Sequence, residues 1–146
     1  MKIFLDTSSL FKLYHKETDT ELIENVFIEN NLTSIFLSEL AKIEFASTVW
    51  KKTRTQEISS TQAEEIILLF ENDFGKYSFV PIDNGITEQA RILIGKYGKL
   101  GLRTLDSIQL STSVSLKQQA DLFITTDKLL DSFLKLEKLP TEKSIS

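Results

Sequence analysis

The stretch KIFLDTSSLF, residues 2–11, decides the fold class and raises the question of function. Its first part, Lys2–Leu5, is a short apolar run that is typical of a buried strand. Asp6 follows directly, although aspartate is depleted in strands and is costly to bury without a partner. A cap for the next helix, provided by Asp6, Thr7 or Ser8, would explain it. The carboxyl end of a strand in an open α/β sheet is also where ligands bind.

Strand and helix signals alternate along the rest of the chain. Short runs of β-branched and aromatic residues predict further strands over residues 33–37, 77–82 and 121–126. Apolar residues at helical spacing predict helices over residues 8–17, 19–30, 38–55, 61–75, 86–98, 104–119 and 127–135. We expect Ser38 to be the N-cap of the third helix and Glu39 to be a capping acid in its first turn. This alternation predicts an α/β fold with a short parallel β-sheet flanked by helices on both faces.

Composition limits the classes of protein and of site. The 146 residues suffice for one domain with a core, and the net charge of −4 argues against binding nucleic acid through bulk positive charge. The chain has no Cys, and His15 is its only imidazole, so we expect neither a disulfide nor a zinc site. We recognise no signal peptide and no apolar run of the roughly 20 residues that span a bilayer. We therefore expect a cytoplasmic protein.

Four carboxylates occupy positions that favour a shared site. Asp6 and Asp127 each follow a predicted strand, and the carboxyl ends of neighbouring parallel strands lie at one edge of a sheet. Glu44 lies within an otherwise apolar helical segment, and Asp106 lies in the first turn of the helix that begins at Thr104. Taken singly, each acid has an ordinary explanation as a helix cap, a surface residue or a first-turn acid favoured by the helix dipole. Together they suggest one acidic cleft.

Convergence of four carboxylates would require divalent cations, because the charges repel one another and cannot all stay ionised unaided. Oxygen-only ligands suit Mg²⁺ or Mn²⁺. One ion would lower the pKa of an attacking water, and a second, about 3.5–4 Å away, would stabilise the leaving oxygen of an in-line phosphoryl displacement. Such a site explains how an acidic protein cuts nucleic acid, since the ions supply the positive charge at the scissile phosphate.

Hydroxyl and basic side chains flank the acids in the sequence. The hydroxyls next to the strand-end acids, which could orient carboxylates or water, are Thr7, Ser8, Thr125 and Thr126. Local capping and turn formation would explain them equally well. Arg103 and Lys128 are candidate phosphate contacts, although a solvated loop charge is the simpler interpretation of each.

The segments DTSSLFKLY, SELAKIEFAST, LRTLDSIQLSTS and FITTDKLL resemble the four signature blocks of PIN-domain proteins, in the same order and at similar spacing. The resemblance extends from Met1 to about Leu130 and is similar in particular to VapC-type toxins of prokaryotic toxin–antitoxin pairs. It implies a single PIN-like domain over residues 1–139, followed by a polar C-terminal tail over residues 140–146. One departure is Gln109, where many relatives have His.

The resemblance also implies an activity. PIN-domain toxins bind Mg²⁺ or Mn²⁺ through an acidic cluster and cleave single-stranded RNA, often at exposed loops of structured RNA. The residues that match the metal-binding and catalytic acids are Asp6, Glu44, Asp106 and Asp127. Thr125 or Thr126 matches the hydroxyl that precedes the last acid. The implied partners are an RNA substrate, a second copy of the chain and a small antitoxin whose C-terminal segment lies over the cleft.

Two other functions are compatible with parts of the sequence. An Asp after the first strand also begins haloacid-dehalogenase-type phosphatases, but their scheme needs a second acid two residues later, where this chain has Ser8. The other alternative is a non-enzymatic PIN-like module that binds RNA or protein. The net charge of −4 favours protein as the partner of such a module, and the complete set of acids argues against it.

Overall fold

The computed structural model describes residues 1–142, and within them it contains one sheet of four parallel strands. The strands, in the spatial order β3-β2-β1-β4, are β1 (Lys2–Leu5), β2 (Ser34–Ser38), β3 (Ser78–Val80) and β4 (Leu122–Ile124). The α-helices are α1 (Thr7–Phe11), α2 (Thr20–Glu29), α3 (Leu40–Arg54), α4 (Ser60–Asn72), α5 (Asn84–Tyr97), α6 (Thr104–Ser115) and α7 (Lys128–Leu136). Two short 3₁₀ helices are η1 (Phe74–Lys76) and η2 (Gly98–Leu100). The predicted α/β class with a parallel sheet is confirmed.

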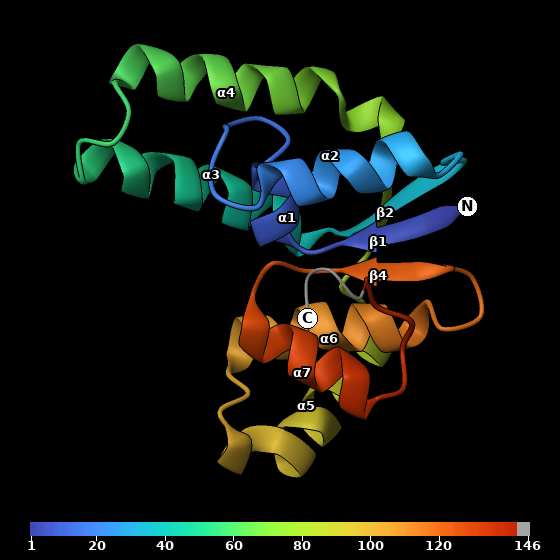
Figure 1. The fold of residues 1–146 in the computed structure, drawn as a ribbon. Helices are drawn as coiled ribbons and strands as arrows, with labels where there is room; N and C mark the ends of the chain where they lie inside the picture. The colour runs from blue at the N-terminus through green and yellow to red at the C-terminus, as the bar shows by residue number, and fades with distance from the viewer. Residues whose placement is uncertain (143–146) are drawn as a thin grey trace.

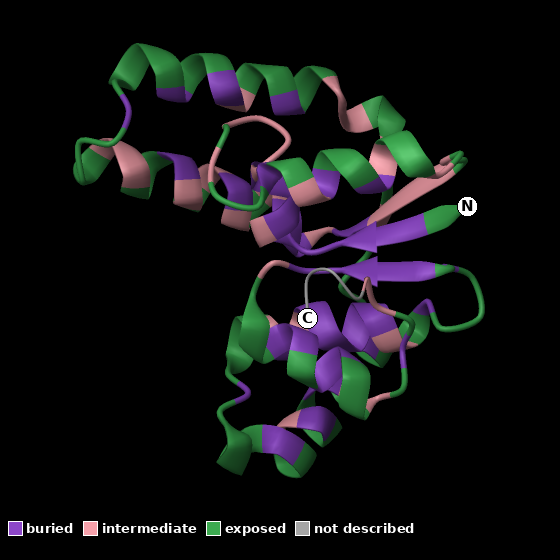
Figure 2. Cartoon of the chain, viewed as in Figure 1, coloured by how far each residue is buried: buried purple, intermediate pink, exposed green. Residues whose placement is uncertain are grey.

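Helices cover both faces of the sheet, with α1 to α4 on one face and α5 to α7 on the other (Figure 1). Each layer has its own apolar core. Ile3 and Leu5 of β1 belong to the core under α1–α4, whereas Phe4 belongs to the core under α5–α7, because successive side chains of a strand point to opposite faces. The helices turn buried faces inward and exposed faces to solvent (Figure 2). The apolar run that follows Lys2 is thus buried on both sides.

The helix expected over residues 8–17 is too long. α1 ends at Phe11, and the amides of Leu13 and Tyr14 donate to carbonyls three residues earlier, each at 3.0 Å. Both side chains nevertheless pack against the first core. The Tyr14 hydroxyl also donates to the Asp73 carboxylate at 2.7 Å. The apolar spacing in this segment therefore reflects tertiary burial of a turn and not a continuous helix.

The start of α3 also differs from the prediction. Ser38 is the last residue of β2, although its hydroxyl accepts a hydrogen bond from the Leu40 amide at 3.1 Å. Glu39 stands at the N-cap position without a capping hydrogen bond, and its carboxylate pairs with Lys42 at 2.6 Å. The reason is conformational: a capping residue needs extended backbone, and Glu39 is helical at φ −55° and ψ −28°.

Pro140 and Thr141, the first two residues of the tail predicted over residues 140–146, lie beside the sheet. The Phe123 amide donates to the Pro140 carbonyl at 2.9 Å, and Thr141 forms an isolated parallel bridge with Phe123. This contact partly covers the outer edge of β4. The remainder of the tail, residues 143–146, lies outside the described part of the chain.

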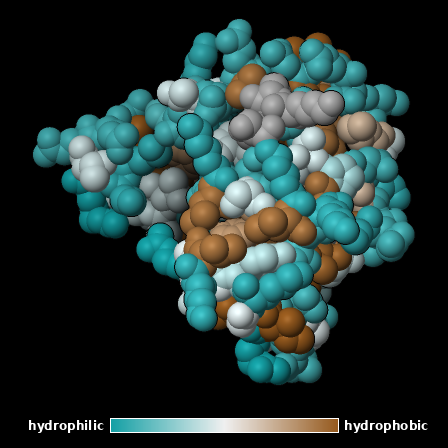
Figure 3. Space-filling view, turned by 60° about the horizontal axis from the view of Figure 1, so that its bottom comes forward, coloured by the Kyte–Doolittle hydropathy of each residue, from teal (hydrophilic) through white to brown (hydrophobic). Residues whose placement is uncertain are grey.

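The surface is mixed in character. Figure 3 shows one face on which hydrophilic side chains predominate and apolar ones gather in separate patches. Within residues 1–142, none of the helices combines the length and the apolar character needed to cross a bilayer.

Aromatic rings fill the core between α3 and α4. The Phe45 side chain is 1% exposed, and its ring centroid lies 4.3 Å from that of Phe70, 5.4 Å from Tyr14 and 5.6 Å from Phe11. Because Phe45 follows Glu44 on α3, its burial fixes the rotation of the helix and so the direction in which the Glu44 carboxylate points. Packing in this core therefore supports the site described below.

Truncation of the Phe45 side chain should destabilise the fold. We expect Phe45→Ala to lower the free energy of unfolding by about 3–5 kcal/mol, because it removes buried ring contacts and leaves a cavity. Urea denaturation measures this change. The matched control is Ile43→Ala on the same helix, where the side chain is 69% exposed and the expected change is within about 0.5 kcal/mol. Equal effects of the two substitutions would contradict the described packing.

Candidate active site

Two of the predicted acids meet at one edge of the sheet because their strands are neighbours. β1 pairs with β4 in a register that places Leu5 opposite Ile124. The amide of Asp6 extends this ladder and donates to the Ile124 carbonyl at 3.2 Å. Asp6 and Asp127 therefore follow the carboxyl ends of adjacent strands, as the sequence predicts.

The other two acids reach the same place from opposite layers. Glu44 projects from α3 on one face of the sheet, and Asp106 from the first turn of α6 on the other. All four acids line one cleft of about 290 Å³. The polar residues that share its lining are Thr7, Ser8, Lys12, Glu17, Thr48, Lys52 and Gln109. The structure thus brings together carboxylates that lie far apart in the sequence.

Asp6 both caps a helix and faces the cleft. Its side chain accepts from the Ser9 amide at 3.1 Å, from the Ser8 hydroxyl at 2.8 and 2.9 Å, and from the Thr125 hydroxyl at 2.6 Å. Burial raises the pKa of this carboxyl, and the hydrogen bonds from Thr125, Ser8 and Ser9 act in the opposite direction. The carboxylate is therefore held in one orientation at a position that disfavours its charge.

The predicted hydroxyls connect the two strand ends. The Thr126 hydroxyl donates to that of Ser8 at 3.1 Å, and the Thr125 hydroxyl accepts from the Asp127 amide at 3.0 Å. Asp127 in turn caps α7 by accepting from the Leu130 amide at 2.9 Å. Asp127 is therefore a helix cap that also lines the cleft, whereas the Thr126 hydroxyl bonds across the fold and does not cap a helix.

A second network holds Glu44. The Thr7 hydroxyl and the Gln109 side-chain amide each donate to Glu44 Oε1 at 2.8 Å. Gln109 Nε2 also donates to Thr7 Oγ1 at 3.1 Å. Gln109 is 3% exposed, and its Oε1 is a buried acceptor that has no hydrogen-bond partner within residues 1–142. A buried oxygen without a donor is costly, and Gln109 is one of the residues that line the cleft.

Asp106 shows the electrostatic cost of the arrangement. Burial raises the pKa of this carboxyl, and the negative charges of Asp127 and Glu44 raise it further, while the Arg103 guanidinium opposes both. Arg103 and Asp106 line a second hollow that also includes Glu44. Lys128 lies exposed in the first turn of α7, next to Asp127.

In this conformation the acids are not gathered around one point. Within residues 1–142, no three His, Asp or Glu side chains are arranged to ligate a single metal ion. The Asp6, Glu44 and Asp127 carboxylates instead bond to hydroxyls, backbone amides and the Gln109 side chain. Their donor set, which consists of carboxylate oxygens with a nearby unpartnered amide oxygen, still has the chemistry that hard divalent cations prefer.

Sequence reasoning missed three charged residues of the cleft, which are Lys12, Glu17 and Lys52. Lys52 lies eight residues after Glu44 on α3, so helical spacing would have placed it on the same face. Lys12 and Glu17 belong to the turn that was expected to be helical, and no pattern in the sequence indicates where that turn carries them.

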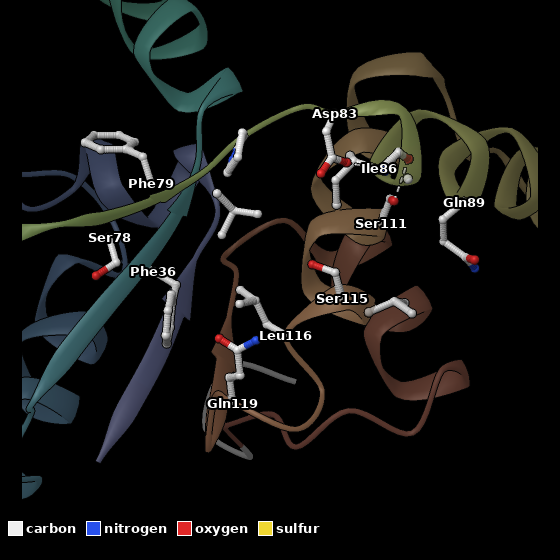
Figure 4. Close-up of a pocket in the computed structure, with 14 residues that line it drawn as sticks. Phe36, Ser78, Phe79, Asp83, Ile86, Gln89, Ser111, Ser115, Leu116 and Gln119 are labelled. Atoms are coloured by element: carbon white, nitrogen blue, oxygen red, sulfur yellow. Dashed lines mark hydrogen bonds between the residues drawn. The ribbon is translucent and has the colours of Figure 1, made fainter.

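A larger hollow of about 630 Å³ lies between the outer edge of the sheet at β3 and helices α5 and α6 (Figure 4). Asp83 is its only ionisable lining residue, and its carboxylate caps α5 by accepting from the Ile86 amide at 2.9 Å. The Ser111 hydroxyl donates to the Ile86 carbonyl at 2.7 Å. Because the fold itself uses these polar groups, the acidic cleft is the better candidate for chemistry despite its smaller volume.

Comparison with known proteins bears on this cleft. A family model described as PIN domain matches residues 3–135. VapBC2 from Rickettsia felis, solved bound to a DNA fragment from its promoter, is 17% identical with a TM-score of 0.65, covering 97% of this chain and 98% of that chain. VapC20 from Mycobacterium tuberculosis, described as a sarcin-ricin loop cleaving toxin, is 13% identical with a TM-score of 0.67, covering 89% and 93%.

A third similar structure, VapBC-1 from nontypeable Haemophilus influenzae, is 15% identical with a TM-score of 0.63 and covers 97% of each chain. No curated protein matches the chain by sequence. At these identities the solved structures show a shared fold, and the family assignment rests on the family model. Since that model spans nearly all of a chain whose parallel sheet, two helical layers and strand-end acids fit the resemblance seen in the sequence, the chain belongs to the PIN domain family.

Proposed function

We propose that this protein is a metal-dependent endoribonuclease that hydrolyses phosphodiester bonds in single-stranded or loop regions of RNA. The observation that carries the proposal is the meeting of four carboxylates, from both strand ends and both helical layers, in one cleft. Burial and the charges of Asp127 and Glu44 raise the pKa of Asp106, so the cluster disfavours the ionised form of this carboxyl, and a functional origin is the better explanation of its position. Membership of the PIN domain family supports it.

The residues that would hold Mg²⁺ or Mn²⁺ are Asp6, Glu44, Asp106 and Asp127. When bound, a pair of such ions supplies positive charge at the scissile phosphate and lowers the pKa of the attacking water. The protein's own contribution is orientation. Ser8 and Thr125 fix Asp6, while Thr7 and Gln109 fix Glu44. A carboxylate whose direction is fixed before binding loses less entropy when it becomes a ligand.

Other groups of the site have supporting roles in this proposal. Thr126 holds the Ser8 hydroxyl. Arg103 lines a hollow with Asp106 and Glu44, Lys128 is exposed next to Asp127, and both would contact phosphates of the RNA. Positive charge at the rim would offset the repulsion between RNA and a chain of net charge −4.

We also propose that the protein is the toxin of a VapBC-type toxin–antitoxin pair, with a small antitoxin as its partner, and that it forms a homodimer. The structures similar to it include VapBC complexes and a toxin described as cleaving the sarcin-ricin loop. Copurification of the chain with the product of a neighbouring short reading frame tests the antitoxin, and light scattering tests the dimer.

Replacement of the strand-end acid should abolish cleavage and leave the fold intact. We expect Asp6→Asn to lower the rate of RNA cleavage with Mg²⁺ or Mn²⁺ by more than about 100-fold, because it removes a metal-ligating charge. The Asn oxygen still accepts from the Ser9 amide, so α1 keeps its cap. Fragment analysis of total cellular RNA, with metal and with chelator, measures the rate.

The control for that experiment is Asp83→Asn, which alters another helix-capping aspartate, located outside the acidic cleft. It should cleave as the wild type does. Full metal-dependent activity of Asp6→Asn would contradict the assignment, and a folded wild type that cleaves no RNA under any condition would favour the binding module.

Removal of one repelling charge should stabilise the metal-free protein. In chelator at pH 7, we expect Asp106→Asn to raise the Tm by ~2–4 °C, which is the shift that ~1 kcal/mol produces in a chain of this size. A carboxyl with a raised pKa binds its proton more readily in the folded state. Acidification therefore stabilises the wild type relative to the variant, and the gap in Tm should close as the pH falls through the raised pKa.

Thermal unfolding across a pH series measures this gap. Glu88→Gln, which removes an exposed carboxylate paired with Arg91 on α5, should show no comparable rise in Tm. Addition of Mn²⁺ should stabilise the wild type more than Asp106→Asn, since a ligand stabilises the state that binds it. A variant that is less stable than the wild type in chelator would refute the proposed repulsion.

A further inference from the structure

The acidic cleft contains positive charge that the proposed acid cluster does not use. Among the described residues that line it, Lys12 and Lys52 are the only cations. Lys12 follows α1 and lies one helical turn beyond Ser8. Glu44, Thr48 and Lys52 follow one another at intervals of four residues on α3, which places Lys52 about 12 Å from Glu44 along the helix axis. Lys52 therefore lies beyond Glu44 along α3, and the Lys12 ammonium donates to the Ser8 carbonyl at 3.5 Å.

One carboxylate occupies the space between the two ammonium groups. Glu17 Oε2 lies 2.8 Å from Lys52 Nζ, and Glu17 Oε1 lies 3.9 Å from Lys12 Nζ. The side chains of Lys12 and Lys52 are 14% and 16% exposed, so both charges are largely withdrawn from solvent. Glu57 contacts Lys52 at 3.6 Å from outside the cleft, and its own side chain is 56% exposed.

Glu17 is held in this position by its backbone. Its amide donates to the hydroxyl of Thr20, which is 2% exposed, at 2.8 Å. The carboxylate is thus an anion held by two cations inside a cleft, and an RNA phosphate carries the same sign of charge that these lysines neutralise. A structural ion pair alone would need only one lysine, and it would not need to face the cleft that contains the four acids.

We propose that Lys12 and Lys52 form a subsite for a backbone phosphate of single-stranded RNA, next to the cleaved nucleotide, and that Glu17 occupies this subsite in the free protein. The proposal rests on the proposed ribonuclease function for the identity of its ligand. RNA that enters the cleft displaces the Glu17 carboxylate and pairs a phosphate with the two ammonium groups. Glu17 then competes with RNA, so it lowers affinity for weakly held strands.

Binding of a short, fluorescently labelled oligouridylate in chelator tests the subsite without any cleavage. Loss of the competing carboxylate in Glu17→Gln should tighten binding about fivefold at low salt. Lys12→Gln and Lys52→Gln should each weaken it about fivefold and reduce the magnitude of the salt slope by about 0.7, the value for one contact with a single strand. Lys52→Arg should retain binding.

Charge-matched controls separate the subsite from net charge. Glu88→Gln on α5 makes the same change in net charge as Glu17→Gln, and Lys96→Gln, which removes the partner of Glu137, makes the same change as the lysine variants. Both controls should bind RNA as the wild type does. Equal binding by Glu17→Gln and Glu88→Gln, equal binding by Lys52→Gln and Lys96→Gln, or the absence of binding by every variant would overturn the proposal.

Cleavage assays on the same variants distinguish this proposal from the proposed function. If the wild type cleaves RNA, Glu17→Gln should lower KM with kcat unchanged. If the wild type cleaves RNA but Glu17→Gln binds RNA no more tightly than Glu88→Gln, the subsite is refuted and the proposed nuclease function stands. If the wild type never cleaves RNA but Glu17→Gln binds RNA more tightly than the wild type, the proposed nuclease function is refuted and the subsite is supported.

Discussion

The pairing of β1 with β4 is the constraint on which the rest of the site depends. It places Asp6 and Asp127 at adjacent strand ends, and the two helical layers then bring Glu44 and Asp106 to the same edge. Carboxylates that meet in this way repel one another: burial raises the pKa of Asp106, and the charges of Asp127 and Glu44 raise it further. The fold pays for this arrangement through its cores, where apolar burial on both faces of the sheet supplies the stability.

The hydrogen-bond networks around Asp6 and Glu44 explain how carboxylates that repel one another remain ordered. The Ser8 and Thr125 hydroxyls fix Asp6. Thr7 and Gln109 fix Glu44. Gln109 connects α6 to α3 and leaves its Oε1 without a partner in the described residues. Asp6 and Glu44 therefore stand in fixed directions before any ligand arrives, and the side chain that carries the unpartnered Oε1 also holds Glu44.

Much of this could be predicted from the sequence, because strands and acids are local signals. The strands that precede Asp6 and Asp127, Lys2–Leu5 and Leu122–Ile124, are short and mostly apolar. Their parallel arrangement follows from the helices between strands. Tertiary packing decided what the sequence could not. Tyr14 lies at a spacing that predicts a helix, yet it belongs to a turn, where its hydroxyl donates to Asp73. Glu17 reaches Lys52 only because α1 ends early.

A calorimetric titration with Mn²⁺ shows whether the four acids form a binding site for divalent cations. We expect saturable binding to the wild-type protein and its loss when Asp6 and Asp106 are both replaced by Asn, with the fold retained in circular dichroism. Absence of binding heat at millimolar Mn²⁺ from a folded wild-type protein would contradict it.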